Sequence, residues 1–236
     1  VVNFMGGEPT LHPQFNEIFS NTLNAMQAYA GLGIFTNGLM PDKVLTLLQQ
    51  VAGINGSIKR QIQFSALVNW QTAENTTDRN HERCRHTAVT LLKSNGYSVT
   101  FSINLYSKKQ DLHNQCREID KIYQDVGLPK NQRYKIRVSP AFPIVGNTDN
   151  TYLPIRDYPE VGRIMIEILK QFPQMDFRFD CSFPPCFLDE ILEEEYNLVE
   201  RFFFHGFKQV PAIHEWKTQD LYFGCADGSP MDVDPV

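Results

Sequence analysis

Strand-like and helix-like segments alternate along most of this chain, and that alternation restricts its fold more than any other feature of the sequence. Between the strands, apolar residues recur every three or four positions, which is typical of helices buried along one side. Repeated strand–helix–strand units join parallel strands through right-handed connections. The sequence therefore predicts an α/β fold with a parallel sheet. The predicted strands cover residues 1–5, 33–36, 61–67, 97–105, 134–139 and 176–180.

Three of these strands have one apolar face and one polar face, over residues 61–66, 99–105 and 135–139. Parallel strands covered by helices on both faces would instead be apolar throughout. One interpretation is a sheet with a solvent-exposed side. The other is a barrel or half-barrel with helices outside and a polar interior that holds a ligand. We favour the second, because three successive strands share the pattern and each is followed by a helix or a long loop.

Composition narrows the classes of function. Of the 236 residues, 22 are Lys or Arg and 27 are Asp or Glu, so the net charge of −5 gives no general attraction to a nucleic-acid backbone. No apolar run is long enough to cross a bilayer, and five cysteines are an odd number without a secretion signal. We therefore expect a cytoplasmic protein with no nucleic-acid or membrane partner.

Glycine and polar residues follow the predicted strands at their carboxyl ends. Gly6, Gly7 and Glu8 follow the first strand, and Asn37 follows the second. Paired glycines let a backbone approach a ligand closely, and the carboxylate of Glu8 can receive an ammonium group. Because the carboxyl edge of a parallel sheet is where α/β proteins build active sites, we expect a ligand site there. Later residues predicted to lie at the same edge are Ser65, Asn104 and Ser139.

Segments 2–13, 34–38, 102–105 and 138–147 strongly resemble the radical S-adenosylmethionine (SAM) enzymes. The resemblance implies a partial (β/α)6 TIM-like barrel, here truncated at the first strand. It also implies reductive cleavage of SAM by a 4Fe-4S cluster, giving a 5′-deoxyadenosyl radical that abstracts hydrogen from a substrate, with peptides or proteins as one substrate class. The electron donor would be a flavodoxin or a ferredoxin.

The same resemblance assigns roles to individual residues. Gly6, Gly7 and Glu8 would bind the amino end of SAM, and Ser65 and Asn104 would contact its carboxylate or ribose. The stretch from Ser139 would line the adenine, and Arg79 would be a carboxylate partner. The predicted cofactor-binding set is Gly6, Gly7, Glu8, Asn37, Ser65, Arg79, Asn104 and Ser139.

The family's Cys-x-x-x-Cys-x-x-Cys loop, whose thiolates hold the catalytic cluster, does not occur in this sequence. Since the chain begins within a strand pattern and without Met, we expect it to be a fragment whose parent carries that loop. Loss of the loop in the parent is the alternative.

Three further cysteines predict a second metal site. Cys181 and Cys186 flank a Pro-Pro turn, and Cys225 lies in a glycine turn. Such loops suit Fe–S or zinc ligation, although small buried side chains are the ordinary fate of isolated cysteines. The tail resembles the start of SPASM or twitch auxiliary iron–sulfur domains. We therefore divide the chain into a radical SAM core, 1–172, and a truncated auxiliary subdomain, 173–236.

Two alternatives remain at this point. One is a non-catalytic metal- or nucleotide-binding (β/α) barrel module that has lost the catalytic cluster. The other is a (β/α) barrel hydrolase that uses Glu8 as acid or base, which would need a second carboxylate opposite Glu8.

Overall fold

The computed structural model describes residues 1–26, 30–55, 62–71, 76–94, 97–129, 132–141, 151–179, 185–199 and 201–204. The chain forms two compact units. Unit 1 comprises Val1–Ser102 and Lys121–Leu128, and unit 2 comprises Ile103–Asp120 and Pro129–Val236. The predicted boundary at 172/173 stays a prediction, since most of the predicted auxiliary subdomain lies outside the described residues.

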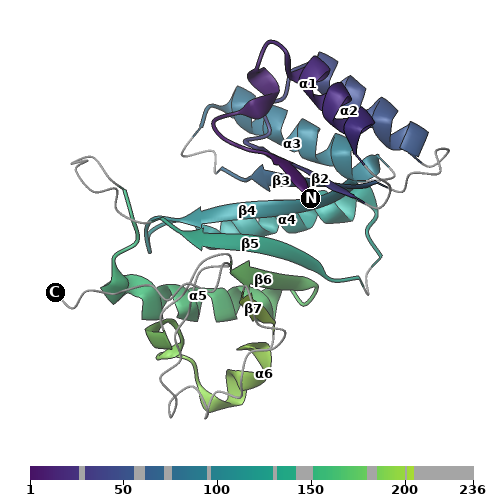
Figure 1. The fold of residues 1–236 in the computed structure, drawn as a ribbon. Coiled ribbons are helices and arrows are strands. Elements are labelled where there is room, and N and C mark those ends of the chain that lie inside the picture. Colours follow the sequence, from purple (N-terminus) through teal and green to yellow (C-terminus); the bar gives the residue numbers. More distant parts are fainter. Residues whose placement is uncertain are drawn as a thin grey trace. The chain divides into compact units, whose positions relative to one another are not determined.

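The described part of unit 1 contains four parallel strands that pair in the order of the sequence (Figure 1). Along the third strand, Phe64, Ala66 and Val68 are buried, whereas Gln63 and Ser65 are exposed. One face of this sheet is therefore apolar and covered, and the other is polar and open. The strands are β1 (Val2–Phe4), β2 (Gly31–Thr36), β3 (Gln63–Asn69) and the first six residues of β4 (Tyr97–Leu105).

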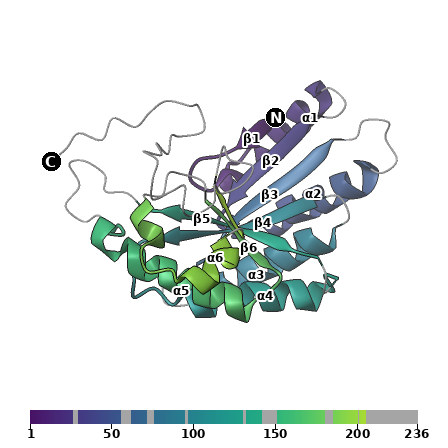
Figure 2. The ribbon, with the colours of Figure 1, turned by 90° about the horizontal axis from the view of Figure 1, so that it is seen from below.

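The helices of unit 1 pack on the apolar face (Figure 2). The rings of Phe15 and Phe19 contact that of Phe4, and the Tyr97 hydroxyl donates to the Leu48 carbonyl at 3.1 Å. The side-chain oxygen of Thr77 caps the third helix. These elements are η1 (Pro9–Leu11), α1 (Phe15–Ala25), α2 (Asp42–Asn55) and α3 (Asp78–Lys93).

The described part of unit 2 contains three complete strands, which also pair in parallel and in chain order. The predicted α/β fold with parallel strands is thus confirmed in each unit. Residues 202–204 were not predicted as a strand, yet they form the last strand among the described residues. The strands are β5 (Tyr134–Pro140), β6 (Met175–Phe179) and β7 (Phe202–Phe204), beside the last three residues of β4. The helices are α4 (Leu112–Val126, whose first nine residues belong to unit 2), η3 (Ile155–Asp157), α5 (Tyr158–Gln171), η4 (Pro185–Leu188), η5 (Glu193–Glu195) and α6 (Tyr196–Val199). None of the described helices is both long and apolar enough to cross a membrane.

A cluster of aromatic rings fills the core of unit 2. Phe179, Phe187 and Phe202 contact one another at centroid distances of 5.4–6.1 Å. Gly162 in α5 lies directly against the Phe187 backbone, where an added Cβ would sit 1.9 Å from the carbonyl oxygen. The glycine therefore allows α5 and η4 to pack closely.

A buried arginine joins β7 to the rest of this core. The Arg201 side chain is 8% exposed and donates to the carbonyl oxygens of Leu169 and Phe172, both at 2.8 Å, and to that of Met175. It also donates to the buried carboxylate of Asp176 at 3.3 Å. Burial lowers the pKa of Arg201, and the carboxylate opposes that change.

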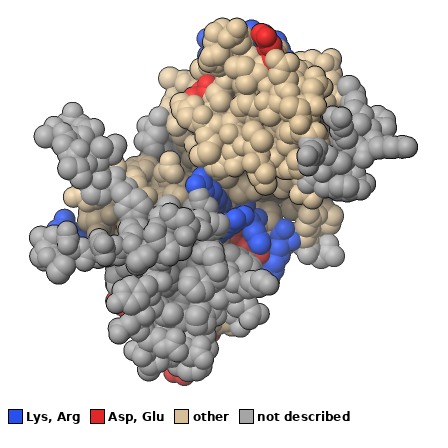
Figure 3. Space-filling view, viewed as in Figure 1, with Lys and Arg blue, Asp and Glu red and all other residues tan. Residues whose placement is uncertain are grey.

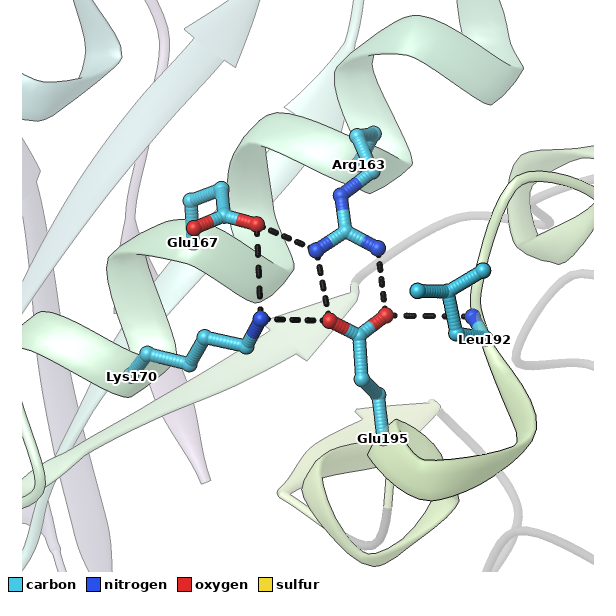
Figure 4. A network of polar contacts seen from close by, with 5 residues as sticks. All are labelled: Arg163, Glu167, Lys170, Leu192 and Glu195. Atoms are coloured by element: carbon cyan, nitrogen blue, oxygen red, sulfur yellow. Dashed lines mark hydrogen bonds and ion pairs between the residues drawn. The ribbon is translucent and has the colours of Figure 1, made fainter.

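An ion-pair network joins η5 to α5 (Figure 4). The Glu195 carboxylate receives hydrogen bonds from Arg163 at 2.6 Å, from Lys170 at 2.5 Å and from the Leu192 N–H at 3.0 Å. Glu167 contacts the same two cations from one side. The network therefore attaches η5, a segment of three residues, to the long amphipathic helix α5.

Candidate functional site

The Gly-Gly turn after β1 depends on glycine for its backbone conformation. Gly6 has φ = 94° and Gly7 has φ = 52°, and both are exposed. A Cβ added at either position would meet nothing within 4 Å, so packing does not require glycine here. The left-handed conformation is what favours it. The turn leaves this stretch of backbone open to solvent, as the sequence predicts for a ligand loop.

The Glu8 carboxylate is engaged within the protein. One oxygen accepts from the N–H and the hydroxyl of Thr10, and the other accepts from the Thr36 hydroxyl at 2.8 Å and the Asn37 N–H at 2.7 Å. A carboxylate has about four acceptor positions, so these four bonds use its capacity. Glu8 thus ties the turn after β1 to the end of β2. A ligand ammonium would have to displace or share one of these donors.

The turn after β2 is built around the same contacts. The Thr36 hydroxyl accepts from the Gly38 N–H at 3.0 Å, and the Asn37 side-chain oxygen accepts from the Leu39 N–H at 2.9 Å. Gly38 has φ = 79°, and an added Cβ would lie 2.4 Å from the sulfur of Cys84 in α3. Glycine is therefore required here by both conformation and close approach.

The two cysteines whose side chains the structure describes are buried thiols with raised pKa values. Cys84 and Cys116 are free and buried. Burial, with a smaller contribution from the Glu8 carboxylate, raises the pKa of the Cys84 thiol to about 12. Burial also raises the pKa of Cys116.

A row of small and polar residues crosses the open face of unit 1. Asn3, Gly33, Ser65 and Ser98 are register partners on four successive strands. Asn3, Ser65 and Ser98 are exposed. A Cβ on Gly33 would lie 2.2 Å from the Asn3 side-chain oxygen and 3.1 Å from the Ser65 hydroxyl, so the bare glycine backbone lets these side chains lie across it.

The same face also contains a buried hydroxyl without a described partner. Ser102 lies four residues after Ser98 in β4, so both side chains point to one side, and it pairs in register with Asn69. Its oxygen is buried and, within the described part of the chain, makes no hydrogen bond. Buried hydroxyls nearly always have a partner, which makes this atom a candidate ligand contact.

Of the predicted residues, unit 1 brings together Gly6, Gly7, Glu8 and Asn37. Ser65 does belong to the polar face, but its predicted position at a strand end is wrong. It is the third residue of β3, because that strand continues to Asn69. Asn3 and Ser98 were not among the predicted site residues. The alternation of β1 and β4 was the signal that placed them on the polar face.

The remaining predicted residues lie elsewhere. Arg79 is exposed in the first turn of α3. Asn104 and Ser139 are the penultimate residues of β4 and β5, as expected for strand ends, and belong to unit 2. Cys181 and Cys225 lie outside the described residues, and Cys186 lies in η4 with its side chain undescribed. The metal site at these three cysteines stays a prediction. Among the described residues, no three His, Cys, Asp or Glu side chains gather as metal ligands.

Comparison with known proteins gives one partial similarity. No family model and no solved structure matches the chain. A tRNA dimethylallyltransferase of Saccharopolyspora erythraea is 28% identical over 83 residues, which are 35% of this chain and 27% of that protein. The chain thus spans about a quarter of the length of the curated relative it matches.

This similarity contradicts the predicted function. The resemblance to radical SAM enzymes predicted reductive SAM cleavage and hydrogen abstraction, whereas the similar protein is named for the transfer of a dimethylallyl group. The radical reaction is therefore withdrawn. Since the similar protein is an enzyme, the comparison does not favour the non-catalytic barrel module either. It agrees with the broader expectation of an enzyme.

Proposed function

We propose that the open face of unit 1 binds a small polar ligand, with SAM as the first candidate, in an enzyme that transfers a group. The observation that carries the proposal is the row of Asn3, Ser65 and Ser98 over the bare backbone of Gly33. The transferase similarity supports the reaction class. We also propose that the chain forms a partial (β/α) barrel. The parallel pairing of strands in chain order within each unit supports this fold.

The chemistry of this face suits a ligand with hydroxyl, amino and carboxylate groups. Serine hydroxyls and the asparagine amide each donate and accept hydrogen bonds. Ser102 adds a buried oxygen on the same face that has no hydrogen-bond partner among the described residues. Because the Glu8 carboxylate is occupied by four donors, we assign ligand recognition to the hydroxyls and to the exposed backbone of the Gly-Gly turn.

Titration calorimetry with SAM tests the binding site. Removing one hydroxyl in Ser65→Ala or Ser102→Ala should weaken binding roughly three- to tenfold, the value of one neutral hydrogen bond. Gly33→Ala should weaken it at least as much, because the new methyl group would displace Asn3. Ser20→Ala on α1 is the matched control, and thermal unfolding should show that all four variants fold. No binding of SAM, or equal affinities in all variants, would refute the assignment.

We propose a small-molecule acceptor rather than tRNA. The net charge of −5 provides no general attraction to a phosphate backbone, although the similar protein is named for tRNA. Filter binding with bulk tRNA at low and physiological salt tests this. Tight retention that falls steeply with salt would contradict the proposal.

A further inference from the structure

Apolar side chains form a second row across the open face of unit 1, beside the polar row described above. Phe35 in β2 and Leu67 in β3 are register partners, and each lies two residues beyond a member of the polar row. Both are half-buried, whereas their strand neighbours Ile34 and Ala66 are buried in the core. Met5 follows the last residue of β1, which pairs with Ile34, and it is 63% exposed. We call Met5, Phe35 and Leu67 the apolar row.

Polar groups border the apolar row on both sides. The polar row lies toward the start of the strands. Toward their carboxyl ends, Asn69 lies two residues beyond Leu67 and pairs in register with Ser102. The buried Ser102 oxygen has no hydrogen-bond partner among the described residues. Rows that lie two residues apart along a strand are separated by about 7 Å. The open face therefore presents a narrow apolar strip between two polar borders.

The open face is also uncharged. None of the four strands of unit 1 contains a charged residue, and residues 1–41 contain neither Lys nor Arg. The Glu8 carboxylate in this stretch is already bonded to donors of the protein. In Figure 3, the described surface of unit 1 that faces the viewer is mostly tan, with few charged side chains. Because an ion is costly to desolvate without a charged partner, the strip favours a neutral group.

We propose that the apolar row is the subsite for a flat aromatic ring of the ligand, with a purine base as the first candidate. This inference rests on the ligand site proposed for the same face. A purine has apolar faces and polar atoms around its edge, which match an apolar strip with polar borders. Phe35 offers a ring on which a base can stack, and the sulfur of Met5 makes favourable contacts with aromatic rings.

Two other occupants suit the strip less well. An alkyl chain would cover the Ser102 hydroxyl without giving it a partner, which is costly for a buried polar group. A protein partner of a stable complex buries about 800 Å² on each side, far more than three partly exposed side chains provide. The size of the strip and its polar borders therefore favour one ring of a small molecule.

Titration calorimetry with adenosine tests the subsite, because adenosine has the purine base and lacks the amino-acid part of SAM. Phe35→Leu should raise the dissociation constant roughly fivefold or more, the value of one base–aromatic stack. Met5→Ser should raise it about two- to tenfold, and its exposed position should let this variant fold as the wild type does. Ile18→Ser, which removes an exposed apolar side chain from α1, should leave it within about twofold.

Stacking provides a second readout, because it lowers the ultraviolet absorbance of a bound base, and Phe35→Leu should reduce that change. No binding of adenosine, or equal affinities in Met5→Ser and Ile18→Ser, would overturn the proposal. Self-association of the wild-type protein that Met5→Ser abolishes would also overturn it, since the strip would then be a protein contact. If SAM still binds and responds to Ser65→Ala in these cases, only the aromatic subsite fails. If SAM does not bind either, the function proposed for this face fails with it.

Discussion

Glu195→Gln should destabilise the protein at neutral pH and much less in acid. The Glu195 side chain is 4% exposed, and its carboxylate accepts from Arg163, Lys170 and the Leu192 N–H (Figure 4). The first of these, the hydrogen bonds from Arg163, is the largest cause that lowers the pKa of Glu195 from 4.5 to about 2. Burial opposes the change without cancelling it.

The lowered pKa sets both the size and the sign of the effect. A change from 4.5 to about 2 corresponds to at most about 3 kcal/mol of folding free energy. Since the folded pKa lies below the unfolded one, this stability is present in full above pH 4.5 and is lost as the pH falls toward 2. Glutamine retains some hydrogen bonding, so we expect a loss of about 1–3 kcal/mol at neutral pH.

Urea unfolding followed by circular dichroism measures this loss. The free energies of unfolding of wild type and Glu195→Gln should differ by that amount at neutral pH and by less than half of it near about pH 3. Glu194→Gln is the matched control, because Glu194 is exposed in the same turn, and its free energy should stay within about 0.5 kcal/mol of the wild-type value.

A difference that is the same at both pH values would refute the reasoning. It would mean that Glu195 stabilises η5 by packing rather than by its charge. An equal loss in Glu194→Gln would likewise show that the acidic run as a whole, and not the network with α5, is responsible.

Three further predictions concern the other buried contacts. Arg201→Lys should lower the free energy of unfolding by about 3 kcal/mol, because one ammonium group cannot serve three carbonyl oxygens and the Asp176 carboxylate together; an unchanged urea midpoint would contradict this. Gly38→Ala should cost at least about 1 kcal/mol, since a Cβ would lie 2.4 Å from the Cys84 sulfur at a positive φ, and thermal unfolding measures it. Cys84 and Cys116 should resist alkylation by iodoacetamide at pH 8 in the folded protein, because burial raises the pKa of both thiols. Both should react in urea, and mass spectrometry of the alkylated peptides measures the difference.

The sequence by itself determined the elements and the two-faced character of the sheets. Periodicity predicted most strands and helices, since apolar side chains must repeat every second residue in a half-buried strand and every three to four in a helix. It also placed Ser65 on a polar face, because side chains alternate along a strand. It missed β7, where three consecutive phenylalanines give no alternation.

Only the tertiary structure decided which residues meet. Register between strands aligned Asn3, Gly33, Ser65 and Ser98, and it set Phe35 beside Leu67. The register between strands far apart in sequence depends on how their faces pack. The pattern of residues within one strand does not specify that register. The same holds for Glu8. Its motif predicted a ligand contact, but only folding showed that its carboxylate lies within hydrogen-bonding distance of Thr36 and Asn37.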